Sequence, residues 1–147
     1  MEVMRTILLL FSTFSLGNTE AEECPFGWTH FGEKCYKFFS WQVDWITAEK
    51  NCQSFDANLA SVRGHVENEF LLSLVPVSAR CLVGGYDWVD DGQWLWSDGT
   101  TFDYTNWCSN EPSEGTENCL EINWTTDRCW NNIPCSLQIG SICAKGM

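Results

Sequence analysis

The sequence has little that would support catalysis. Histidine occurs only twice, as His30 and His65, and neither lies in a catalytic signature. No G-x-S-x-G motif is present, and no C-x-x-C pair offers the short spacing of a zinc site. These absences argue against an enzyme and against a zinc protein.

Basic residues and long apolar runs are also scarce. Lys and Arg number 8 against 20 Asp and Glu, which gives a net charge of −12 at pH 7. Such a surface repels nucleic acid and anionic membranes, because binding to either depends on clustered basic residues. The apolar run at residues 7–16 is about half the roughly 20 residues that a membrane-spanning helix needs. We therefore expect neither nucleic-acid binding nor membrane insertion.

Residues 1–17 have the pattern of a secretory signal peptide. Arg5 precedes the apolar run, and Ser15 and Gly17 put small residues at the −3 and −1 positions of a cleavage site. Residues 18–23 then form a short acidic tail, and residues 24–147 have the length of one domain. We expect a secreted, extracellular protein.

All nine cysteines follow this leader. In an oxidising compartment they are expected to form disulfides, which matter here because so short a domain has a modest core. An odd number leaves one cysteine over, as a free thiol, as a link to another chain, or in a different internal pairing.

The residue pattern predicts an α+β domain, because two helices precede a run of strands. Asp44 is a good N-cap for a helix to about Ser54, with Ala48 and Cys52 on one face. A second helix is predicted from about His65 to Leu74, with Phe70, Leu71 and Leu74 buried. The predicted strands are 24–28, 31–36, 82–83, 94–96, 119–122, 128–130 and 142–145.

Several motifs together resemble the C-type lectin-like domain, over essentially all of the mature chain. The resemblance is greatest to secreted single-domain fish lectins and the related type II antifreeze proteins. It implies two helices, short antiparallel sheets and a long irregular loop region held by disulfides. The motifs are Cys52, 59–61, 67–70, 82–85, Trp94-Leu95-Trp96-Ser97-Asp98-Gly99, Cys119, Trp130-Asn131-Asn132, Cys135 and Cys143.

The resemblance implies a set of disulfides. Three are typical of the family: Cys24–Cys35, Cys52–Cys143 and Cys119–Cys135. A fourth, Cys108–Cys129, lies where the antifreeze proteins place an additional bridge. Cys81 remains, and we expect it to link two chains into a homodimer, with a buried thiol or another internal pairing as the alternatives.

The resemblance also implies a carbohydrate site. In sugar-binding members, a Glu-Pro-Asn or Gln-Pro-Asp triplet with a cis proline, a later Glu and a Trp-Asn-Asp triplet surround one calcium ion, which needs six to eight oxygen ligands. The matching residues here are Glu111, Ser113, Glu117, Asn131 and Asn132. Glu111, Glu117 and Asn131 keep the expected type and would hold the metal if it were present.

Two of these positions differ from the family pattern. Ser113 has a short hydroxyl where an amide or carboxylate is usual, and Asn132 replaces a carboxylate. We therefore expect sugar binding that is calcium-independent or only weakly assisted by calcium, with no required cofactor.

The Glu-Pro-Ser triplet matches neither the mannose-type nor the galactose-type version. We predict β-galactoside (lactose) binding from the resemblance, with Trp124 stacking on the sugar. Asn123-Trp124-Thr125 is an N-glycosylation sequon, and a glycan on Asn123 would shield Trp124.

The leading hypothesis is a secreted lectin that binds cell-surface glycans and agglutinates cells as a dimer in innate or mucosal defence. One alternative is an ice-binding antifreeze protein. Another is a protein-binding or toxin module on the same fold.

Overall fold

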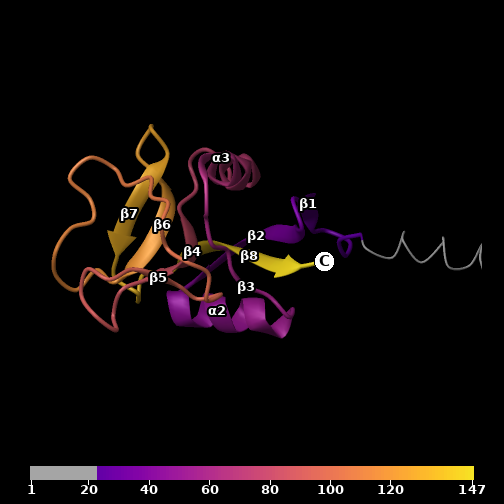
Figure 1. The fold of residues 1–147 in the computed structure, drawn as a ribbon, viewed down its shortest axis with the longest axis horizontal. Coiled ribbons are helices and arrows are strands. Elements are labelled where there is room, and N and C mark those ends of the chain that lie inside the picture. Colours follow the sequence, from indigo (N-terminus) through magenta and orange to yellow (C-terminus); the bar gives the residue numbers. More distant parts are fainter. Residues whose placement is uncertain (1–22) are drawn as a thin grey trace, which may run out of the picture.

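The structure, a computed structural model, describes residues 23–147 (Figure 1). The predicted signal peptide, and all of the predicted acidic tail except Glu23, lie outside the described residues. The α+β prediction is confirmed. The elements are β1 (Thr29–Phe31), β2 (Lys34–Val43), α2 (Trp45–Ser54), β3 (Asn58–Leu59), α3 (His65–Leu74), β4 (Cys81–Tyr86), β5 (Leu95–Trp96), β6 (Cys119–Trp124), β7 (Cys129–Ile133) and β8 (Ile139–Gly146).

Helix α2 begins where its cap predicts. The Asp44 carboxylate accepts a hydrogen bond of 2.9 Å from the Thr47 N–H, and this bond lowers the pKa of Asp44. Ala48 and Cys52 are buried, as predicted. The described residues contain no helix long and apolar enough to cross a membrane.

Helix α3 has the predicted bounds but a different buried face. Asn68, Leu71 and Leu72 are buried, whereas Phe70 and Leu74 are only partly buried. The reason is that positions 68, 71 and 72 form one helical stripe with 75, and this stripe faces the core.

The strands form one sheet in the order β1-β2-β8-β4-β6-β7, with β3 and β5 beside it. Most pairs are antiparallel, as expected, but β4 and β8 are parallel. The strand predicted at 24–28 is wrong. This segment is a turn closed by a 3.0 Å hydrogen bond from Trp28 N–H to the Pro25 carbonyl, with Gly27 at φ +88°.

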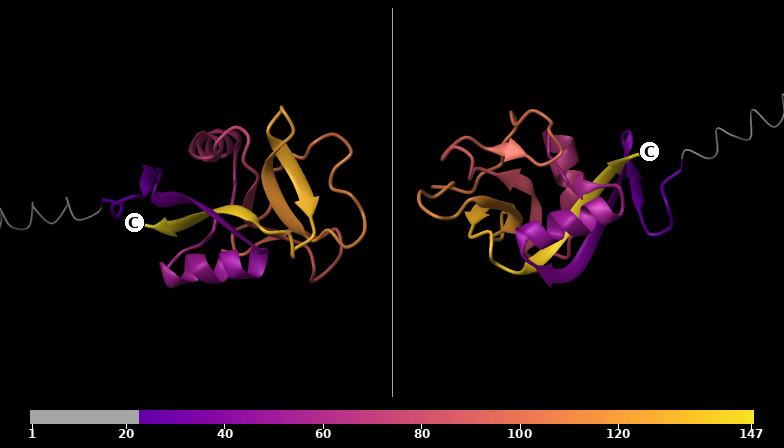
Figure 2. Two further views of the ribbon diagram at one scale, coloured as in Figure 1. Left: turned by 180° about the vertical axis from the view of Figure 1, so that it is seen from behind. Right: turned by 90° about the horizontal axis from the view of Figure 1, so that it is seen from below.

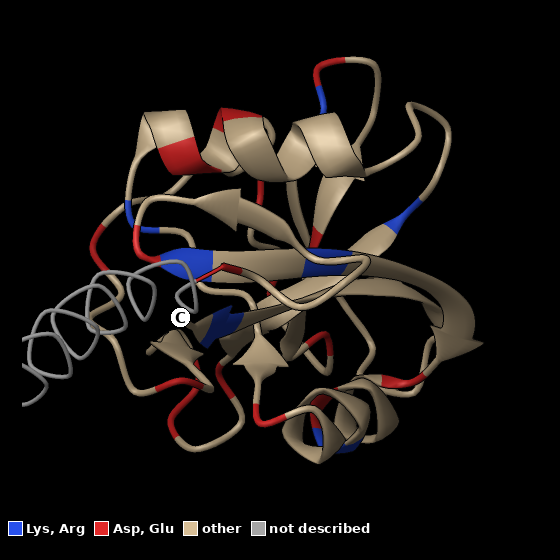
Figure 3. Cartoon of the chain, turned by 90° about the vertical axis from the view of Figure 1, so that its right-hand side faces the viewer, with Lys and Arg blue, Asp and Glu red and all other residues tan. Residues whose placement is uncertain are grey.

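The two helices cover opposite faces of the sheet (Figures 1 and 2). One core cluster contains Leu71 and Leu72 of α3, with Trp96 and Trp130. The other contains Trp45, Ala48 and Cys52 of α2. Asp and Glu occur on both helices and on several loops rather than on one face (Figure 3).

All four predicted disulfides are present, with Cα–Cα distances of 5.0–5.5 Å. Cys52–Cys143 joins α2 to β8 across 91 residues. In the chain-entropy account, a loop of that length stabilises the fold by about 4–5 kcal/mol.

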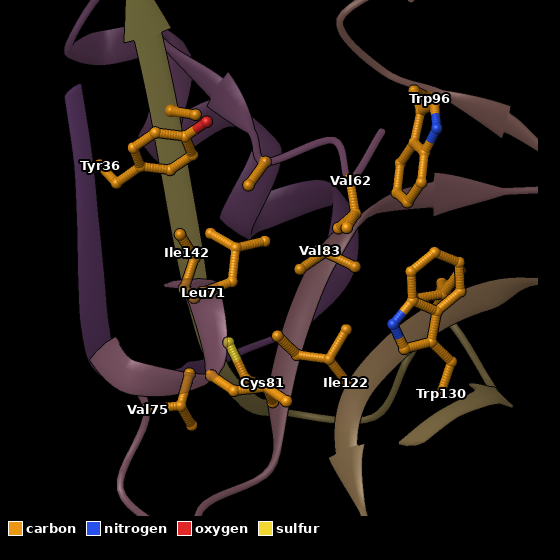
Figure 4. Packing of buried hydrophobic residues seen from close by; sticks show 14 residues of the cluster. Tyr36, Val62, Leu71, Val75, Cys81, Val83, Trp96, Ile122, Trp130 and Ile142 are labelled. Carbon is orange, nitrogen blue, oxygen red and sulfur yellow. The ribbon is translucent and has the colours of Figure 1, made fainter. Parts of the chain in front are cut away.

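The structure corrects the prediction that Cys81 forms an interchain disulfide. Cys81 is unpaired, and its exposed fraction is 0%. It lies among Val75, Ile122 and Ile142 in the core (Figure 4). Because the sulfur cannot reach a second chain without leaving the core, the structure matches the buried-thiol alternative.

Candidate functional site

The loop that precedes β6 carries the candidate site, and both of its ends are anchored. Cys108 is bridged to Cys129, and Cys119 to Cys135. Next to Cys108, the segment pairs with the backbone of Trp130 through two hydrogen bonds of 2.8 Å. The Glu111–Pro112 peptide bond in this loop is cis.

Asn132 holds this loop from β7. Its amide nitrogen donates to the carbonyls of Ser113 (2.7 Å) and Glu117 (2.8 Å), and its amide oxygen accepts from the Ser113 N–H (2.8 Å). The residue is 2% exposed. Both ends of one buried amide are therefore used to clamp the loop, an arrangement that a carboxylate could not make because it has no N–H to donate.

Glu111 and Glu117 present carboxylates beside this clamp. The Ser113 hydroxyl donates to both Glu111 oxygens, at 2.8 Å to Oε2. Glu117 is half-buried, and its carboxylate makes no hydrogen bond within residues 23–147. Both carboxylates keep free lone pairs that can accept hydrogen bonds from sugar hydroxyls.

Asn131 does not join this group. Residues 131 and 132 are consecutive in β7, so their side chains lie on opposite faces of the strand. The Asn131 amide donates to Glu121 at 3.0 Å. Its predicted place beside Glu111 and Glu117 is therefore not supported by any hydrogen bond.

Trp124 also lies elsewhere. It ends β6 opposite Cys129, whereas Asn132 pairs with Leu120 near the start of the same strand. Trp124 is 37% exposed, and the Arg80 guanidinium lies 4.8 Å from the centroid of its ring. The Trp124 ring packs on Arg80, and no hydrogen bond joins it to the Glu111 side chain within residues 23–147, so the stacking of Trp124 on a sugar held by Glu111 stays a prediction.

Asn123 is unsuited to carry a glycan. It is 6% exposed, and its amide nitrogen donates to the carbonyls of Pro76, Val77 and Ala79. A sugar on that nitrogen would displace these bonds, so the predicted glycosylation conflicts with the fold.

The loop does not fit a calcium ion as the family pattern would hold it. The Asn132 amide nitrogen donates hydrogen bonds to the carbonyls of Ser113 and Glu117. The Asn131 amide donates to Glu121 instead. Within residues 23–147, no three Asp, Glu, His or Cys side chains are grouped as metal ligands. Two carboxylates are few for a cation that takes six to eight oxygens.

Sequence reasoning missed one cluster on the opposite face of the β6–β7 ribbon. The fully buried Glu121 binds Arg80 through two hydrogen bonds of 2.8 Å. The available signal was a carboxylate inside the apolar strand pattern of β6, because a buried charge needs a partner. Nothing in the sequence identified Arg80 as that partner.

Two helices on a sheet, with a disulfide-braced loop that contains a cis Glu-Pro bond, define a C-type lectin-like protein. Consistent with this, a family model described as the lectin C-type domain matches residues 41–145. The chain belongs to this family.

The relatives include both lectins and ice-structuring proteins. Ladderlectin of Oncorhynchus mykiss is 43% identical over 77% of this chain, which spans 63% of that protein. The galactose-specific lectin nattectin of Thalassophryne nattereri is 36% identical over 84% of this chain and 81% of its own length. A type-2 ice-structuring protein of Osmerus mordax is also 36% identical, over 84% of this chain and 71% of its own.

The similar solved structures likewise include an antifreeze protein and a C-type lectin domain. Herring type II antifreeze protein superposes with a TM-score of 0.82 at 35% identity, covering 84% of this chain and 99% of that one. The C-type lectin domain of murine dendritic cell inhibitory receptor 2, solved in complex with N-glycan, has a TM-score of 0.81 at 30% identity. That alignment covers 85% of this chain and 100% of the receptor domain.

Proposed function

We propose that this protein is a secreted, non-enzymatic lectin that binds β-galactosides through Glu111 and Glu117 without requiring calcium. The clamp made by Asn132 carries the proposal. It orders the loop by direct hydrogen bonds, so no cation is needed to hold the two carboxylates in place. Four disulfides are consistent with an extracellular location.

Galactosides are proposed on two grounds. A relative named as a galactose-specific lectin is 36% identical over most of this chain. Carboxylate oxygens accept hydrogen bonds from sugar hydroxyls, and an aromatic ring commonly covers the sugar's C–H face.

The test compares retention on immobilised lactose and on immobilised mannose. We expect the wild-type protein to be retained on lactose, released by free lactose, and unaffected by EDTA. The double variant Glu111→Gln/Glu117→Gln keeps the loop geometry but weakens the acceptors, so it should pass through. The control Glu114→Gln, an exposed residue of the same loop, should still be retained. Release by EDTA, or retention of the double variant, would refute the proposal.

Ice binding is the second candidate function, because ice-structuring proteins are among the relatives and the Cys108–Cys129 bridge is present. It predicts thermal hysteresis in a protein that is retained on neither resin. An osmometer measurement on the same samples separates the two functions.

A further inference from the structure

A second concave site shares no residue with the loop of Glu111. It is bounded by β2, the start of β8, and the segment between α3 and β4, and its volume is about 390 Å³. This is within the ~300–1,000 Å³ range of small-molecule sites. We call it the β2–β8 pocket; the lining residues used below are Phe38, Ser40, Gln42, Ser78, Arg80 and Gly140.

Arg80 lines this pocket just before β4, and its guanidinium is held on β6. Its Nε and Nη2 each donate at 2.8 Å to the fully buried Glu121, and the guanidinium lies over Trp124. Nη1 makes no hydrogen bond within the described part of the chain. Because Glu121 neutralises the charge of Arg80, the pocket carries no unpaired charge, which favours a neutral ligand over an anion.

The wall of the pocket is held in place from behind. Asn123 binds three carbonyls of the segment that carries Ser78, at 2.6–3.1 Å. Arg128 binds the carbonyls of Leu72 and Val75 at 2.8 and 3.0 Å. A wall ordered before binding lowers the entropic cost of holding a ligand.

Gly140 makes room for an aromatic ring on the floor. A Cβ at this position would lie 3.2 Å from two atoms of the Phe38 ring and 3.0 Å from the Phe39 carbonyl oxygen. Glycine therefore lets Phe38 lie close against the backbone of β8. The ring is only partly buried, so part of its surface remains available to a ligand.

The polar side chains around this ring are unused. Ser40, Gln42 and Ser78 are exposed, and none makes a side-chain hydrogen bond within residues 23–147. No Asp or Glu lines the pocket. Two hydroxyls and an amide around an aromatic ring match a ligand with several hydroxyls and one apolar face.

We propose that the β2–β8 pocket is a second saccharide site, which takes a neutral pyranose with its C–H face on Phe38 and its hydroxyls on Ser40, Gln42 and Ser78. This inference does not depend on the function proposed for Glu111 and Glu117. Its exposed walls indicate a weak site, visible in solution titrations rather than as column retention. A chain with both sites would connect two glycans without an interchain disulfide.

The test is an NMR titration of ¹⁵N-labelled protein with methyl β-galactoside, methyl β-glucoside and methyl α-mannoside. We expect at least one of these sugars to shift the backbone amides of residues 38–42 and 78–80 in a saturable way. Glu111→Gln/Glu117→Gln should leave these shifts intact, which separates this site from the lectin loop.

Ser78→Trp fills the pocket at an exposed position and should abolish the shifts. Ser136→Trp, another exposed serine outside the pocket, should keep them. Amides of the pocket that do not move with any of the three sugars, or that move equally in Ser78→Trp, would overturn the proposal. Thermal melts of both variants verify that they are folded.

Discussion

Asn132 and Ser113 are joined by a reciprocal pair of hydrogen bonds: the Ser113 N–H donates to the Asn132 side chain at 2.8 Å, and the Asn132 amide returns a bond of 2.7 Å to the Ser113 carbonyl. The pair spans from β7 to the loop that carries Glu111. At the position where the family pattern has a carboxylate, Asn132 thus makes a direct structural contact with the loop.

Asn132→Asp should make this loop depend on calcium. The substitution removes two N–H donations and places a buried carboxylate against the carbonyl oxygens of Ser113 and Glu117. Leaving such groups unsatisfied lowers the free energy of unfolding by about 1–3 kcal/mol each. We expect a lower melting temperature in EDTA and partial recovery in calcium, because the introduced side chain would add a third carboxylate to those of Glu111 and Glu117.

The matched control is Asn51→Asp on α2, which should show no calcium-dependent change in melting temperature. If Asn132→Asp melted like the wild-type protein in EDTA, the clamp would not stabilise the loop.

Arg80→Ala should destabilise the protein strongly. It leaves Glu121, whose side chain is 0% exposed, as a buried charge without its cation. Removing one partner of a buried pair costs roughly 3–5 kcal/mol. Lys34→Ala breaks the longer contact with Asp98, at 3.8 Å, and should cost less than about 1 kcal/mol. Urea denaturation of the two variants measures the contrast, and equal losses would contradict this reading.

Cys81 should be unreactive in the folded protein. Burial, with a smaller contribution from the nearby Glu121 carboxylate, raises the pKa of its thiol well above the ordinary value. The nucleophilic thiolate is therefore suppressed even at mildly alkaline pH. A thiol reagent should label it only after unfolding, and the protein should migrate as a monomer on a non-reducing gel. As a control, the variant Ser136→Cys places a thiol at an exposed position and should react with the reagent at once. On the gel, a dimer band that disappears on reduction would contradict the prediction.

Asn123 should carry no glycan when the protein is secreted from a eukaryotic cell. Its amide nitrogen is committed to backbone carbonyls. Intact mass should equal that of the bare polypeptide, and Thr125→Ala, which removes the sequon, should not change the gel mobility. A hexose-bearing peptide containing Asn123 would show that the chain is modified before this contact forms.

Local signals explain which predictions succeeded. The Asp44 cap and the helical spacing of apolar residues predicted both helices, because caps and periodicity act over a few residues. The disulfide pairings followed from the family resemblance. The correction concerns contacts between distant segments: Cys81 was expected to reach a second chain, although it packs among Val75, Ile122 and Ile142.

By itself the sequence determined an oxidised α+β domain of the C-type lectin family, since cysteine number, helix caps and family motifs are properties of the chain. Only the tertiary structure decided which side chains share a site. Asn131 and Asn132 are adjacent in the sequence, yet strand alternation sends one to Glu121 and the other to Ser113. The tertiary structure also buries Cys81 and Asn123. Their burial depends on how the sheet and the α3–β4 segment pack, and no local sequence pattern specifies this packing.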